Sequence, residues 1–118
     1  MQEQIKKDII AVLSDLIEIL KVKDDGDIFQ IKSLSNHVIH NASVFQDEDS
    51  ISVAILIYSL SKIMERNEKE LDYGKIRGML NSAAASLKSN NEGAFRKSIK
   101  QMFSFIRTMD AKLKLYIN

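Results

Sequence analysis

Apolar residues recur at intervals of three and four along almost the whole chain, and this spacing restricts the fold more than any other feature. An α-helix gathers such residues on one face, whereas a half-buried strand needs strict alternation. No proline occurs among the 118 residues, so no proline breaks or kinks a helix. No alternating β-branched run bounded by turn residues occurs either. The sequence therefore predicts an all-α protein without strands.

Five helices are expected, in the segments 3–22, 28–46, 50–66, 73–89 and 92–116. The short connections make consecutive helices antiparallel, in either a helical bundle or a short stack of helical hairpins. The length, together with a uniform composition, predicts a single all-helical domain spanning residues 1–118.

The predicted core consists of one stripe on each helix. The fifth helix carries a coiled-coil-like seam, in which spacings of four and three alternate. The stretch 52–64 is apolar on nearly every side apart from a narrow polar strip of Ser52, Ser59 and Lys62. The third helix is therefore expected to be the central one, packed against several others. Its excess apolar surface could also form an oligomer interface. The stripes of the other four helices are Ile5, Ile9, Val12, Leu13, Leu16, Ile17 and Leu20; Ile28, Ile31, Leu34, Val38, Ala42 and Phe45; Tyr73, Ile76, Leu80, Ala83, Ala84 and Leu87; and Phe95, Ile99, Met102, Ile106, Met109, Leu113 and Tyr116. Phe103 and Phe105 lie off the seam and are expected to pack within the bundle.

Acidic residues mark the expected helix starts, where free N–H groups and the positive end of the helix dipole favour carboxylates. Asp27 with Gln30 forms a plausible capping box after a loop over residues 21–27, in which Gly26 would take a left-handed turn conformation. Asp72 is expected to cap the fourth helix. For the third helix, either Asp47 or Asp49 is the expected cap.

The composition excludes several classes of protein. Without cysteine the chain has no disulfide framework, no thiolate nucleophile and no cysteine zinc site. No apolar run approaches the roughly 18 residues of a membrane span, and the first ten residues carry no cleavable signal pattern. We therefore expect a cytoplasmic protein that does not associate with a membrane.

The two histidines, in the stretch SNHVIHNASVFQDEDS over residues 35–50, are the most site-like feature. His37 and His40 lie three residues apart on one flank of the second helix, close to Asn41, and such a pair can reach one metal ion. Asp47 or Glu48 could add an oxygen ligand, but no third ligand is forced into place. We favour the interpretation that His37 lies at the core boundary and His40 on the surface, and we expect no bound metal.

The charges are divided unevenly along the chain. Residues 1–72 hold 8 Lys/Arg and 14 Asp/Glu, a net charge of −6, whereas residues 73–118 hold 9 Lys/Arg and 2 Asp/Glu, a net charge of +7. Folding is expected to bring the two halves together; an acidic partner, RNA or head-to-tail self-association are the alternatives. A candidate basic face lies on the fifth helix and consists of Arg96, Lys97, Lys100, Arg107, Lys112 and Lys114. Nucleic-acid binding is not favoured, since no aromatic residues are interleaved with these bases for stacking.

No catalytic constellation is visible. The four glycines are scattered, so no phosphate-binding loop is formed, and no serine has a base demonstrably beside it. We expect neither an enzymatic activity nor a cofactor.

Residues 42–63 and 85–106 both begin with Ala-Ser and an aliphatic residue and pass through a polar turn into an apolar helix, at an offset of 43 residues. With Ala42, Asp47, Ala54 and Tyr58, the segment 34–63 resembles the helical hairpins of tetratricopeptide repeats and of MIT domains, and the segment 84–106 resembles them more loosely. Two features of tetratricopeptide repeats are missing from the chain, the Trp-Leu-Gly-Tyr consensus and the proline that usually closes the repeat. The resemblance implies a groove between helices that receives a partner's helix or peptide.

The chain is also similar in size and helix number to HEPN proteins, small helical nucleases and nucleotidyltransferase partners. Their catalytic Arg is followed four to six residues later by His, whereas Arg107 is followed by Thr-Met-Asp-Ala-Lys-Leu and both histidines come early. The preferred hypothesis is a non-catalytic helical protein–protein interaction or scaffold module, with a homodimer as the expected assembly. The alternative is a small helical RNA-binding protein or a nuclease-related HEPN-like protein, either active or inactive.

Overall fold

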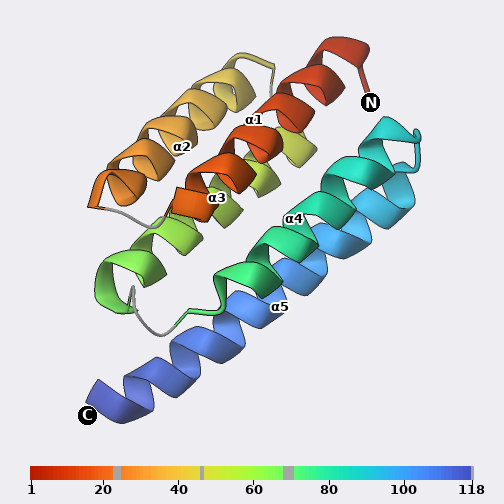
Figure 1. Cartoon of the computed structure of the whole chain (residues 1–118). Coiled ribbons are helices and arrows are strands. Elements are labelled where there is room, and N and C mark those ends of the chain that lie inside the picture. Colours follow the sequence, from red (N-terminus) through yellow and green to blue (C-terminus); the bar gives the residue numbers. More distant parts are fainter. Residues whose placement is uncertain (23–24, 46, 68–70, 118) are drawn as a thin grey trace.

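The structure, a computed structural model, describes the backbone of residues 1–22, 25–45, 47–67 and 71–117, and the side chains of residues 1–21, 29–40, 47–65 and 71–109. The prediction of an all-α fold with five helices is confirmed. The helices are α1 (Glu3–Val22), α2 (Asp25–Phe45), α3 (Glu48–Asn67), α4 (Tyr73–Lys88) and α5 (Glu92–Ile117). Consecutive helices are antiparallel, and the described backbone contains no strand (Figure 1).

α1, α3, α4 and α5 form a four-helix bundle, and α2 packs against the outside of this bundle. α1 packs against α4, α4 against α5, and α5 against α3, while α3 also touches α1. In the described part of the chain, α2 packs only on α3 and α1, on the side away from α4 and α5 (Figure 1). α1 contacts α4 directly, although α2 and α3 lie between them in the sequence. In a solenoid each repeat contacts only its neighbours, so the arrangement is a bundle.

The predicted stripe residues whose side chains the structure describes are buried or half-buried. On α2 these are Ile31, Leu34 and Val38, whereas Ile28, Ala42 and Phe45 lie outside the described side chains. All seven stripe residues of α1 and all six of α4 are buried. On α5, Met109 is half-buried at the end of the seam, and Leu113 and Tyr116 lie outside the described side chains. Phe103 and Phe105 are half-buried against the core, which confirms that they pack within the bundle. The buried seam residues of α5 are Phe95, Ile99, Met102 and Ile106.

The predicted caps of α3 and α4 are confirmed, and the start predicted for α2 is wrong. The Asp72 carboxylate accepts a hydrogen bond from the Lys75 backbone N–H at 3.0 Å. Of the two alternatives for α3, Asp47 is the cap, and its carboxylate accepts from the Ser50 N–H at 2.8 Å. α2 begins at Asp25, three residues before the predicted start, so Asp27 and Gly26 lie in its first turn and neither caps it nor forms a left-handed turn. Carboxylates are as favourable inside a first turn as at a cap, which is why the pattern misplaced the boundary.

The alternation of direction gives the two ends of the bundle different chemistry. α1, α3 and α5 run the same way, so their N-terminal ends meet at one end of the molecule (Figure 1). Each of these helices has an acidic residue in its first turn, Glu3, Glu48 with Asp49, and Glu92 respectively. The acidic first half of the chain thus meets the basic α5 at this end. Among the described residues, no helix combines the length and the apolar character needed to cross a membrane.

Candidate functional site

The histidine pair lies on the exposed side of α2. Both His37 and His40 are exposed, and the side chain of Asn41 lies outside the described set. Asp47, one of the two suggested oxygen ligands, is engaged as the cap of α3. Within the described part of the chain, no three His, Asp, Glu or Cys side chains gather in a way that could hold a metal ion. The structure therefore brings the two histidines to one surface, with no third ligand among the described side chains.

The basic residues of α5 do not act as one uniform face. Arg96, Lys97, Lys100 and Arg107 are all exposed, while the side chains of Lys112 and Lys114 lie outside the described set. Arg96 is fully engaged with acidic neighbours. Its Nε and Nη2 atoms donate to the two carboxylate oxygens of Asp49, both at 3.0 Å. These hydrogen bonds are the main reason why the pKa of Arg96 is raised.

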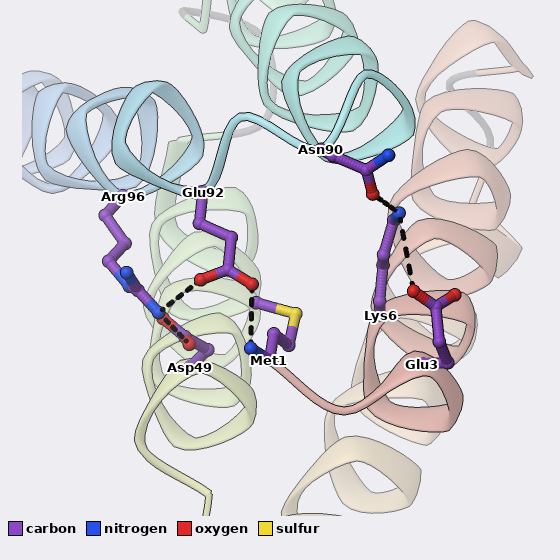
Figure 2. A network of polar contacts seen from close by, with 7 residues as sticks. All are labelled: Met1, Glu3, Lys6, Asp49, Asn90, Glu92 and Arg96. Atoms are coloured by element: carbon purple, nitrogen blue, oxygen red, sulfur yellow. Dashed lines mark hydrogen bonds and ion pairs between the residues drawn. The ribbon is translucent and has the colours of Figure 1, made fainter.

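A polar network joins the N-terminal ends of α1, α3 and α5 (Figure 2). Besides Asp49, Arg96 contacts Glu92 at 3.4 Å, and the other carboxylate oxygen of Glu92 lies 2.7 Å from the amino group of Met1. The hydrogen bond from that ammonium group is the largest cause that lowers the pKa of Glu92. On the neighbouring side, the Lys6 ammonium donates to the Asn90 side-chain oxygen and lies 4.0 Å from Glu3.

This network consists of ion pairs that join the N-terminal ends of three helices. Asp49 and Glu92 are both paired with cations: Asp49 with Arg96, and Glu92 with Arg96 and the Met1 ammonium group. None of the residues in Figure 2 is an activated nucleophile beside a general base. From the sequence, Asp49 is only a candidate cap, and no local pattern connects it with Arg96, because 47 residues separate them.

The outward side of α3 carries a stripe of exposed apolar side chains. Ile51, Ile55 and Tyr58 are 41%, 52% and 51% exposed. Lys62 continues the stripe, with its ammonium group 5.4 Å from the centre of the Tyr58 ring. Glu48, one turn before Ile51, is exposed at the other end. We call these five residues, Glu48, Ile51, Ile55, Tyr58 and Lys62, the α3 outer face.

The stripe extends onto α2. The Lys32 ammonium of α2 pairs with the Glu65 carboxylate of α3. This pair places Lys32 and Glu65 at the same level of the two antiparallel helices. Seven residues after Lys32 and seven residues before Glu65, Ile39 of α2 therefore lies level with Tyr58 of α3. Ile39 is 43% exposed and lies on the same side of α2 as Lys32. Large apolar side chains of two helices therefore line one surface.

On its other flank, α3 borders a groove of about 330 Å³ between α3 and α5. Its floor is apolar, with Phe95, Ile99 and Phe103, and charged residues of both signs stand at its edge. Lys100 is one of them, so this residue of the predicted basic face borders the groove. The full lining is Glu48, Asp49, Ser52, Phe95, Arg96, Ile99, Lys100 and Phe103.

An apolar surface beside a groove is suited to binding another polypeptide, since covering it removes apolar area from water. The sequence predicts excess apolar surface on the third helix, interrupted only by a narrow polar strip of Ser52, Ser59 and Lys62. In the structure these three are half-buried, and the isoleucines and Tyr58 are the more exposed.

Comparison with known proteins identifies no relative. No protein family, curated protein or solved structure matches the chain. The resemblances to tetratricopeptide, MIT and HEPN helices thus remain interpretations of sequence patterns.

Proposed function

We propose that the chain is a non-catalytic helical interaction module that binds another protein surface through the α3 outer face. The observation that carries the proposal is the stripe of Ile51, Ile55 and Tyr58, each exposed over two-fifths or more of its surface on consecutive turns of one helix. Single exposed apolar residues are ordinary on protein surfaces. A continuous stripe of large ones, rimmed by charged groups, is typical of a contact surface.

The energetic argument is that this stripe gains stability only when it is covered. Full burial of a large apolar side chain contributes about 1.5–3 kcal/mol, so covering the exposed half of each residue contributes roughly 1 kcal/mol. Three such residues, with Ile39 beside them, supply enough apolar contact for the centre of a modest interface. Tyr58 suits such a centre, because its ring offers a large apolar surface and a hydroxyl group that can be hydrogen-bonded.

The proposal includes a cytoplasmic setting, which suits a chain without cysteine and hence without disulfides. It also includes self-association as one form of the interaction. It assigns no role to His37 and His40, and it does not use the basic residues of α5 for nucleic acid, because Arg96 is engaged by Asp49.

The test is site-specific photo-crosslinking in intact cells. A benzoylphenylalanine residue replaces Ile55 on the α3 outer face or, as the matched control, Ser82, which is also exposed but lies on α4. We expect a discrete adduct of defined mass, with this chain or with another protein, at position 55 only. Ile51→Asp in the same chain should remove it. Equal labelling from both positions would refute the proposed function.

A further inference from the structure

The α3 outer face has a symmetry that indicates its partner. Its five residues are spaced by three, four, three and four, so they fall within roughly 80° of the helix circumference. Ile55 is the middle residue. Glu48 and Lys62 stand seven residues before and after it, each about 10 Å away along the helix. The stripe therefore has an apolar centre, an acidic end and a basic end at equal distances.

We propose that this face binds a second copy of the same chain, with the two α3 helices antiparallel and a two-fold axis passing beside Ile55. The inference rests on the proposed function and adds the identity of the partner. In this arrangement Ile55 of one copy faces Ile55 of the other, and Ile51 faces Tyr58. Ile51 and Tyr58 both lie toward the side of α3 that faces α2, where Glu65 pairs with Lys32. The two-fold axis therefore brings Ile51 of one copy and Tyr58 of the other to the same side of the interface.

The charges select this orientation. With the helices antiparallel, Glu48 of each copy stands opposite Lys62 of the other, so two ion pairs form. With the helices parallel, Glu48 would face Glu48 and Lys62 would face Lys62. Opposite charges favour the first arrangement and like charges oppose the second.

Both charged residues are available for such pairs. Glu48 is exposed, although Asp49 beside it is held by Arg96. Lys62 makes a 3.9 Å contact with Glu65, whose carboxylate is also paired with Lys32, and its ammonium group lies 5.4 Å from the centre of the Tyr58 ring of the same face. Lys62 can therefore turn to a carboxylate on the partner without leaving Glu65 unpaired.

The same helix spacing is used by antiparallel coiled coils, in which residues at alternating intervals of three and four interlock along a shared seam. The flanking helices α2 and α5 leave this side of α3 exposed, as the exposed half of Ile55 shows. Ile39 on α2 then widens the contact at the level of Tyr58. A second copy supplies the same residues in the reverse order, so every apolar residue of the face has an apolar counterpart.

The decisive experiment is a charge exchange followed by sedimentation equilibrium over a range of protein concentrations. We expect a dimer for the unaltered chain. Glu48→Lys alone and Lys62→Glu alone each replace two attractive pairs by two repulsive ones, and each should weaken dimerisation by roughly ten-fold or more. The double variant restores both pairs with reversed signs and should dimerise within about three-fold of the unaltered chain. The two single variants, when mixed, should form a heterodimer.

Glu3→Lys and Lys88→Glu are the matched controls, because both residues are exposed away from the α3 outer face. They should leave the dimer unchanged. A monomer at every concentration, single exchanges without effect, or a double exchange without rescue would each overturn the inference.

A second measurement does not depend on charge. The chain has no cysteine, so Ile55→Cys introduces a unique thiol at the proposed axis. We expect rapid disulfide-linked or short bismaleimide-linked dimers from this variant but not from Ser82→Cys. If position 55 fails to link two copies but its photo-adduct contains another protein, the self-pairing is wrong and the proposed function stands. If position 55 gives no specific adduct of any kind, the proposed function itself is refuted.

Discussion

Replacing Phe95 by alanine should cause a large loss of stability. Phe95 lies on α5, is only 1% exposed, and forms part of the floor of the groove beside α3. Truncation of a buried phenylalanine to alanine costs about 3–5 kcal/mol, the sum of lost apolar transfer and of the cavity left behind. We expect the lower end, about 3 kcal/mol, because the new cavity would open into an existing groove that water can enter.

The magnitude converts directly into a melting temperature. With an unfolding entropy of about 2.1 cal/mol/K per residue, a chain of this length has a total of roughly 250 cal/mol/K. A loss of 3 kcal/mol therefore lowers the Tm by about 12 °C. The assay is thermal unfolding followed by circular dichroism, with every variant at the same protein concentration, because self-association makes the Tm depend on concentration.

The control for this prediction is Phe95→Leu, which keeps most of the buried volume. It should cost less than about 1.5 kcal/mol and lower the Tm by no more than about 6 °C. If Phe95→Ala lowered the Tm by less than about 4 °C, or by no more than Phe95→Leu, Phe95 would not be a close-packed contact between α5 and α3.

Three further predictions concern the ends and the surface of the bundle. Asp72→Ala removes the acceptor for the Lys75 N–H and should cost about 1 kcal/mol, a fall in Tm of about 4 °C, whereas Asp72→Asn keeps an acceptor oxygen and should cost less. Gly78→Ala should raise the Tm by roughly 2–4 °C, because Gly78 lies inside α4 with open space around the added methyl group and alanine favours the helix. The lowered pKa of Glu92 stabilises the fold at pH values above the ordinary glutamate value of 4.5, and this stability is lost as the pH falls through the lower folded-state pKa. Glu92→Gln should therefore lower the Tm at neutral pH and make the Tm decrease less as the pH falls. A plot of Tm against pH that stays parallel to that of the unaltered chain would contradict this.

Local periodicity in the sequence predicts most of the fold. The stripes of α1 and α4 are buried as their spacing requires, because an amphipathic helix has one apolar side and buries that side in the core. The caps at Asp47 and Asp72 also follow from local chemistry, since each carboxylate serves an N–H group three residues ahead. The start of α2 could not be fixed in this way, because acidic residues suit both the cap and the first turn.

The tertiary structure alone decides which side of α3 remains exposed. Its sequence is apolar almost all round, so periodicity identifies no outer face, and the position of α2 on one flank and α5 on the other leaves Ile51, Ile55 and Tyr58 exposed. The same is true of the pair between Asp49 and Arg96, which depends on two helix ends meeting in space. Helix formation depends on neighbours within four residues, whereas an exposed surface or a long-range ion pair depends on how whole helices pack, and the spacing of residues along one helix does not determine that packing.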